Sequence, residues 1–192
     1  MTTEGSEYKP GNGWIETLSG RRFHFQEPDP DAMCIEDIAG AISKLCRYNG
    51  HCLRFYSVAE HCVLLAEAAQ FQGFSLQTQY DLLMHDAAEA YLCDLPRPIK
   101  HQLAEYKAVE AKIERVMALK FCYQLDNPVV KEWDSRIIRD ERDQNMSRSG
   151  NEWATDVLEP LGVRLGFWDP TIAEAQYLSA YDRLRRSIAL GL

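Results

Sequence analysis

The sequence has no apolar run that approaches the roughly 20 residues a helix needs to cross a bilayer, so no membrane partner is expected. Its first 13 residues, MTTEGSEYKPGNG, lack the apolar stretch of a secretory signal, and we expect a flexible tail there. The six cysteines form no C-x-x-C pair. A disulfide framework is an alternative for six thiols, but a chain of 192 residues can bury a sizeable core without one. These absences predict reduced, buried thiols in a cytoplasmic protein.

An excess of positive charge is also absent. The chain has 21 Lys and Arg against 29 Asp and Glu, a formal net charge of −8. This balance argues against a nucleic-acid polymer as the main partner. It does not exclude a small phosphorylated molecule, because a bound divalent cation and a few local Lys or Arg can reverse the field inside one cleft. With 46% hydrophobic and 26% charged residues, we expect residues 14–192 to form one globular domain.

Apolar periodicity predicts an all-α bundle with a minor N-terminal β-hairpin. Short alternating runs at 14–17 and 22–25 flank a Ser-Gly turn, which is typical of a hairpin. Helices begin at recognisable caps: Ser57 with Glu60 three residues later forms a capping-box sequence, and Asn127 and Asp169 each precede a proline. The expected helices cover residues 35–47, 57–69, 76–93, 99–123, 128–145 and 171–189.

Three titratable residues, His85, Asp86 and Glu89, fall at helical spacing among Leu and Ala. An unpaired buried charge costs several kcal/mol, so such a group needs a compensating partner, for which a metal ion is the obvious candidate. The alternative is a solvated face with an i,i+4 pair. That alternative is weakened because Ala and Leu flank the three residues on every side, leaving no better face to bury.

Two more polar residues lie on predicted apolar faces. His61 shares a stripe with Val58 and Leu65. Taken alone, it could be a hydrogen-bonded structural histidine. Asp134 lies beside Trp133 and a pair of isoleucines and is expected to point inward, although surface exposure beside a neighbouring arginine is an alternative.

Together these residues offer two imidazoles and two carboxylates from three predicted helices. This donor set suits one divalent transition metal, namely Mn²⁺, Fe²⁺, Co²⁺, Ni²⁺ or Zn²⁺. Four protein ligands around a six-coordinate ion leave two positions for water or substrate, which is typical of a catalytic site.

The same residues resemble the H…HD…D pattern of the HD-domain metal-dependent phosphohydrolases. The matching stretches are SVAEH at 57–61, HDAAE at 85–89, DLPRPIK at 94–100, and Asp134. In particular, the chain resembles the small 5′-deoxynucleotidases and phage dATP triphosphohydrolases. The resemblance covers about residues 35–145 and implies an HD-domain helical bundle.

The resemblance also implies roles for single residues. His61, His85, Asp86 and Asp134 would hold the metal. Glu89 would orient or deprotonate the attacking water, with Asp94 as its acidic partner near the leaving oxygen or sugar. Residues that would contact substrate are Arg47, Tyr48, Pro98 and Lys100.

Lys107 is a further cation that we consider for the phosphate tail. It lies seven residues after Lys100 and is expected on the same side of the same helix; the alternative is a simple solvated lysine. Members with two iron ions need extra histidines between the HD pair and the last Asp, where this chain has only His101. One metal is therefore expected, although substrate phosphates could recruit an additional Mg²⁺.

The function expected from this resemblance is removal of the 5′-phosphate or triphosphate from a small-molecule nucleotide, a purine or adenine deoxynucleotide in particular, by attack of a metal-bound water. A catalytically weak nucleotide sensor on an HD scaffold is the alternative, and a purely structural helical protein is a third. The sequence leaves oligomeric state open. Tyr177 and Tyr181 on the last helix could form a homo-oligomer interface or belong to the core.

Overall fold

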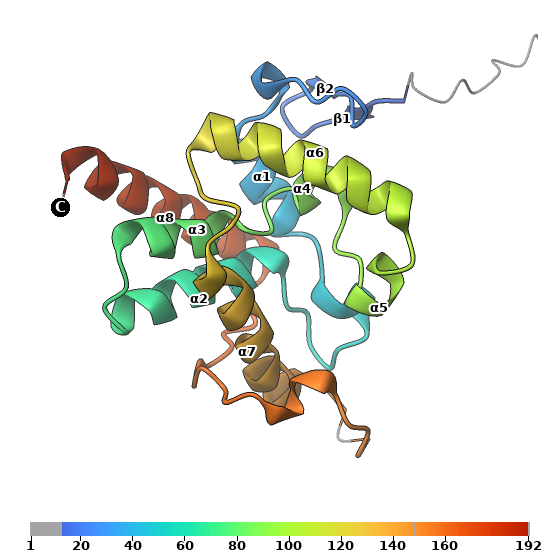
Figure 1. The fold of residues 1–192 in the computed structure, drawn as a ribbon, viewed down its shortest axis with the longest axis vertical. Helices are drawn as coiled ribbons and strands as arrows, with labels where there is room; N and C mark the ends of the chain where they lie inside the picture. The colour runs from blue at the N-terminus through green and yellow to red at the C-terminus, as the bar shows by residue number, and fades with distance from the viewer. Residues whose placement is uncertain (1–12, 148, 192) are drawn as a thin grey trace, which may run out of the picture.

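The computed structural model describes residues 13–147 and 149–191, so the expected N-terminal tail lies outside the described residues except for Gly13. The described chain is helical apart from one small antiparallel sheet (Figure 1). The α-helices are α1 (Ile35–Ile42), α2 (Val58–Phe71), α3 (Leu76–Met84), α4 (Glu89–Leu92), α5 (Arg97–Lys100), α6 (Ala104–Phe121), α7 (Pro128–Asn145) and α8 (Pro170–Leu190). Three short 3-10 helices are η1 (Pro30–Ala32), η2 (Arg47–Gly50) and η3 (Ala154–Val157).

The N-terminal sheet confirms the predicted hairpin. Strand β1 (Ile15–Glu16) pairs antiparallel with β2 (Arg22–Phe23), with Ile15 opposite Phe23. Gly20 adopts a positive φ of 78° in the intervening turn, a conformation that glycine reaches without steric cost. The fully buried Phe23 ring stacks on Tyr91 with ring centroids 4.1 Å apart. The hairpin is therefore anchored by this aromatic pair and by Ser19 in its turn, whose backbone N–H and hydroxyl both donate to Asp37 of α1.

The last helix organises the core. Helix α8 packs against α1, α2 and α3, and Figure 1 shows it passing behind α3 toward the C-terminus. Tyr177 is fully buried and its hydroxyl donates to the Leu83 carbonyl at 3.1 Å. Tyr181 is partly buried against the Tyr80 ring. Of the two alternatives for these tyrosines, the structure places both in or against the core.

Predicted helix caps account for three helix starts. Ser57 accepts from the Glu60 backbone N–H at 3.1 Å, Asn127 accepts from Val129, and Asp169 accepts from two N–H groups of α8. The capping box predicted at α2 is nevertheless half wrong. The Glu60 carboxylate accepts instead from the backbone N–H groups of residues 166–168, which lie more than 100 residues along the chain.

The prediction of one helix over residues 76–93 was wrong, because the chain breaks between α3 and α4. The His85 ring contacts the Leu82 carbonyl at 2.8 Å, the acceptor that a continuing helix would use. The backbone then tightens to i→i+3 bonds, such as Ala87 N–H to Met84 O and Glu89 N–H to Asp86 O. Alanine and leucine around the break give no sequence signal for it.

Two other predicted helices were too long. The segment 99–123 is divided at Leu103, whose extended φ and ψ of −108° and 82° separate α5 from α6. Lys100 and Lys107 consequently lie on different helices rather than on one shared side. Helix α1 ends at Ile42, and Cys46, which the prediction placed in the same helix, pairs instead with Ser57 in an isolated β-bridge.

The six cysteines all fall within the described residues and are free thiols, as predicted. Their predicted burial holds only for Cys62; the others are partly or fully exposed. Among the residues that the structure describes, no helix is both long enough and apolar enough to pass through a membrane.

Helix α6 offers a test of the packing. Ile113 is fully buried, whereas Leu119 on the same helix is 83% exposed. We expect Ile113→Ala to lower the free energy of unfolding by about 2–5 kcal/mol, because it removes buried methyl groups and leaves a cavity. Leu119→Ala should change it by less than about 0.5 kcal/mol. Urea unfolding measures both, and equal losses would contradict this packing.

Candidate metal centre

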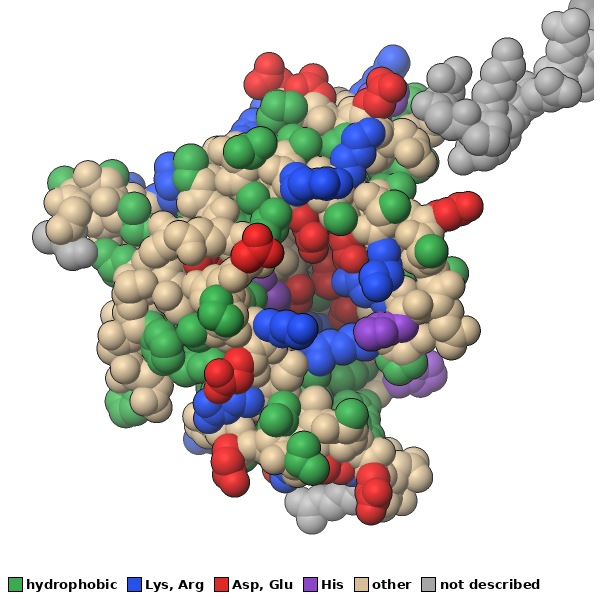
Figure 2. All heavy atoms as spheres, viewed as in Figure 1, with side chains coloured by type: hydrophobic (Ala, Val, Ile, Leu, Met, Phe, Trp, Pro, Cys, Tyr) green, Lys and Arg blue, Asp and Glu red, His purple; other side chains and the backbone are tan. Residues whose placement is uncertain are grey.

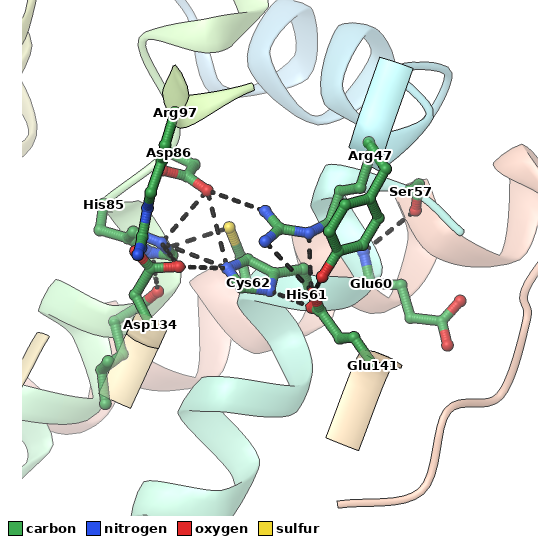
Figure 3. Close-up of polar contacts among 12 residues, drawn as sticks. Arg47, Ser57, Glu60, His61, Cys62, His85, Asp86, Arg97, Asp134 and Glu141 are labelled. Carbon is green, nitrogen blue, oxygen red and sulfur yellow. Dashed lines mark hydrogen bonds and ion pairs between the residues drawn. The ribbon is translucent and has the colours of Figure 1, made fainter. Parts of the chain in front are cut away.

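Four side chains that are far apart in sequence converge at one point (Figure 3). The Nε2 atom of His61 lies 3.4 Å from Nε2 of His85, 3.3 Å from Oδ1 of Asp134 and 3.7 Å from Oδ2 of Asp86. One ligand atom from each of the four residues lies within 4.8 Å of the others. The structure therefore brings together the four residues that the sequence analysis proposed as metal ligands.

Three segments position these ligands. His61 lies one turn after the Ser57 cap of α2 and is completely buried. His85 and Asp86 lie in the tightened turn between α3 and α4. Asp134, for which the sequence left two orientations open, points inward from α7 with its side chain 21% exposed. The break in the helix at His85 is thus part of the site.

The outer nitrogen of each imidazole has its own acceptor. Nδ1 of His61 lies 2.7 Å from Oε1 of Glu141, and Nδ1 of His85 lies 2.8 Å from the Leu82 carbonyl. A carbonyl oxygen only accepts, so His85 carries its proton on Nδ1, and the carboxylate favours the same tautomer for His61. Both Nε2 atoms then face the cluster. Two imidazole nitrogens and two carboxylates at these separations form a donor set that could hold a metal ion.

The carboxylates of the cluster favour their charged forms. Burial alone would raise the pKa of Asp134, but its contacts with His61 and His85 hold that pKa well below its ordinary value. Burial likewise opposes ionisation of Asp86, and the adjacent His85 outweighs it and lowers its pKa. Burial would lower the pKa of His85, but Asp86 raises it well above the usual value. An ion at this centre would displace the His85 proton.

A pocket of about 560 Å³ opens onto two of the proposed ligands, Asp86 and Asp134. Figure 2 shows a hollow on this face in which acidic side chains lie deep and Lys and Arg side chains surround them. Its lining also includes every residue proposed for catalysis or substrate contact except Lys107, namely Arg47, Tyr48, Glu89, Asp94, Pro98 and Lys100.

The two acidic residues proposed for catalysis share this pocket. Glu89 begins α4 and is 6% exposed; within the described part of the chain, its Oε2 has no hydrogen-bond partner. Burial, together with the charges of Asp86 and Asp94, raises the pKa of Glu89 well above its ordinary value. Burial also raises the pKa of Asp94. A carboxylate with a raised pKa in a cleft is suited to accept a proton.

The cations of the pocket are held by acidic partners. Arg47 is buried and its Nη1 lies 3.4 Å from Oδ2 of Asp86. Lys100 lies 2.5 Å from Oε1 of Glu110. Arg97, which also lines the pocket, pairs with Asp134.

Lys107 is exposed on α6, and the described residues that line the pocket do not include it. The geometry therefore favours the solvated-lysine alternative for Lys107.

Sequence reasoning missed three residues at this site. Glu141 contacts His61 but stands in the charged run RDERDQN, where nothing distinguishes it from solvated neighbours. Trp153 and Thr155 line the pocket from the segment around η3, which has no regular apolar periodicity. The spacing of seven between Asp134 and Glu141, two helical turns, is the one signal that could have indicated a shared face.

Comparison with known proteins finds two relatives, but neither of their names indicates an activity. No protein-family model matches the chain. The chain is 42% identical over 108 residues to the uncharacterized protein YfdR of Escherichia coli K12, a match that covers 56% of this chain. It is 34% identical over 113 residues, again 56% of this chain, to an uncharacterized protein of Rhodobacter capsulatus. The matches span 58% of the length of each of these two relatives.

Two aspartates of α7 provide a matched test of metal binding. Asp134 belongs to the cluster, whereas Asp143 is an exposed aspartate on the same helix. We expect Mn²⁺ or Co²⁺ to raise the melting temperature of EDTA-treated protein, because an ion at 100 times its Kd stabilises the fold by about 2.7 kcal/mol. Asp134→Asn should abolish most of this rise and Asp143→Asn should preserve it. Thermal unfolding with and without the ion measures the effect, and an undiminished rise in Asp134→Asn would contradict the site.

Proposed function

We propose that this protein is an HD-type metal-dependent phosphohydrolase that acts on nucleotides. The observation that supports this most is the cluster of His61, His85, Asp86 and Asp134, which adjoins a pocket containing unpaired Glu89. A larger hollow of about 630 Å³ lies elsewhere on the described surface, but its lining has no histidine and no carboxylate–imidazole cluster. The chemistry for hydrolysis is therefore concentrated in one pocket.

The residues of the pocket meet the needs of phosphate ester hydrolysis. A divalent ion held by the cluster would supply Lewis-acid stabilisation of negative charge on the phosphoryl group. Glu89 accepts the proton of the attacking water, a role that its buried position and lack of a competing donor favour. Asp94 lies in the same pocket, and in this proposal it contacts the leaving oxygen or the sugar. Arg47 and Lys100 bind the remaining phosphate oxygens.

Pocket size and aromatic side chains support a nucleotide as the substrate. A volume of about 560 Å³ falls in the range of small-ligand sites. Tyr48 and Trp153 line it with ring centroids 6.0 Å apart and offer π-faces to a base. A deoxyribose sugar and an adenine or other purine base follow from the family resemblance, as do the two cleavage points, monophosphate and triphosphate.

A panel of ribo- and deoxynucleotides at the mono- and triphosphate levels, with Mn²⁺, Co²⁺ or Mg²⁺, tests the activity. We expect release of phosphate or triphosphate together with a nucleoside. Glu89→Gln should lower kcat by about 10²–10⁴-fold, because it removes the proton acceptor but preserves the side-chain shape. Chromatography of the products measures turnover and identifies the bond cleaved.

Glu105→Gln provides the control, since Glu105 is exposed at the start of α6. It should leave kcat unchanged. Nucleotide binding without turnover in the metal-loaded protein would overturn the proposal and favour the nucleotide-sensor alternative. The presence of both Glu89 and Asp94 argues against that outcome, because a sensor does not need a proton acceptor.

Lys100 and Lys107 provide a matched test of which lysine contacts the substrate. Lys100 lines the pocket, whereas Lys107 is exposed outside it. We expect Lys100→Ala to raise the KM for the phosphorylated substrate by about 10-fold or more, since a charge-assisted contact contributes about 1.5–3 kcal/mol. Lys107→Ala should leave KM unchanged. Steady-state kinetics with the best substrate decides, and a larger effect at Lys107 would contradict this assignment.

A further inference from the structure

Glu141 lies behind the proposed metal centre and is completely buried. Its Oε1 accepts from Nδ1 of His61 at 2.7 Å, while Nε and Nη2 of Arg47 each approach the carboxylate to 3.4 Å. The Tyr48 hydroxyl donates to Oε2. Figure 3 shows Glu141 below Arg47 and beside His61, on the side away from Asp86. One carboxylate therefore contacts a proposed metal ligand and two residues of the pocket wall.

We propose that Glu141 is a positioning residue that fixes His61 for metal binding and, through the same carboxylate, holds Arg47 for phosphate. The part that concerns Arg47 rests on the proposed function. This assignment differs from the ligand and catalytic roles above, because Glu141 contacts neither the pocket nor the point where the four ligand atoms meet.

The His61 ring depends on Glu141 for its orientation. The bond to Oε1 keeps the proton on Nδ1 and leaves the Nε2 lone pair directed at His85, Asp86 and Asp134. The equivalent contact of His85 is made by a backbone carbonyl, which no side-chain substitution removes. His61 is therefore the ligand whose orientation a single substitution can release.

Arg47 depends on the same carboxylate for its charge balance. Its guanidinium is buried between Glu141 and Asp86, so without Glu141 a buried cation would retain one acidic partner instead of two. The next residue, Tyr48, has a left-handed φ of 58°, which is uncommon for a residue with a Cβ. The hydrogen bond from its hydroxyl to Glu141 ties this turn to α7.

Helix α7 also provides the metal ligand Asp134, two turns before Glu141. The two residues lie on one face of a continuous helix, so the metal ligand and the group that orients His61 keep a fixed separation. The arrangement links the position of the ion to the position of Arg47 through one rigid element.

Glu141→Gln is the decisive variant, because it keeps the shape but removes the charge that Arg47 requires. Asp140→Asn is its matched control. Asp140 is the preceding residue and is also buried, but it accepts from the loop N–H groups of Leu161 and Gly162. The probes are Co²⁺ alone, followed by its absorption bands, and inorganic phosphate added to the Co²⁺-loaded protein.

We expect Glu141→Gln to weaken Co²⁺ binding by about 10- to 100-fold and to weaken phosphate binding as well. Asp140→Asn should lower the melting temperature of the metal-free protein but leave both dissociation constants within about twofold of the parent, because its partners lie in a loop that is not part of the cluster. If Glu141→Gln does not fold, Glu141→Asp provides a second test of both dissociation constants, since it keeps the charge but withdraws the carboxylate from His61 and Arg47 by one methylene.

Unchanged Co²⁺ affinity in Glu141→Gln, an equal loss in Asp140→Asn, or a parent protein that binds no Co²⁺ would each overturn the proposal. A change in only one of the two dissociation constants would overturn the link between His61 and Arg47. Neither measurement requires turnover. A parent protein that hydrolyses no nucleotide but shows both losses in Glu141→Gln would refute the proposed function and support this inference.

Discussion

The structure depends on the neutralisation of a buried polar cluster at the junction of α2, α7 and the turn after α3. Two imidazole nitrogens lie 3.4 Å apart with two carboxylates beside them, and all four come from segments that also supply core residues. Such groups are costly to remove from water unless opposite charges or hydrogen bonds compensate them. Here Glu141 and a backbone carbonyl contact the Nδ1 atoms of the two histidines, which leaves both Nε2 atoms directed at Asp86 and Asp134.

The same requirement explains the irregular backbone around the site. A continuous helix through residues 76–93 would keep the Leu82 carbonyl in the backbone ladder and deny it to the His85 ring. At the observed break, i→i+3 hydrogen bonds replace regular α-helical ones, and the Leu82 carbonyl orients the His85 ring. The left-handed Tyr48 and the positive φ of 130° at Cys93, just before Asp94, also occur beside the pocket. Of the five non-glycine residues with positive φ in the described chain, three, Tyr48, Asn49 and Cys93, therefore lie at the pocket or next to one of its residues along the chain.

Sequence reasoning was most successful where one physical signal was sufficient. Polar side chains at Ser57, Asn127 and Asp169 cap helices locally, so the starts of α2, α7 and α8 could be predicted. Apolar periodicity could not reveal the breaks at His85 and Leu103. The first accompanies a contact between the His85 ring and the Leu82 carbonyl, and the second follows from the backbone angles of Leu103. Neither position is a glycine or a proline. Glu141 escaped prediction for a related reason. Its burial is created by a helix from another part of the chain.

The contact between Glu60 and residues 166–168 has a consequence for assembly of the protein. Glu60 is adjacent to His61, and its carboxylate accepts three backbone N–H groups, the last of them 108 residues away. Glu60, which precedes the proposed ligand His61, is thus hydrogen-bonded to residues 166–168. These residues leave the ribosome only after all four proposed ligands have been synthesised. A nascent chain that ends before residue 166 would contain every ligand, yet the Glu60 carboxylate would be without these three donors. The hydrogen bonds of Glu60 can therefore be completed only after residues 166–168, which lead into α8, have been synthesised.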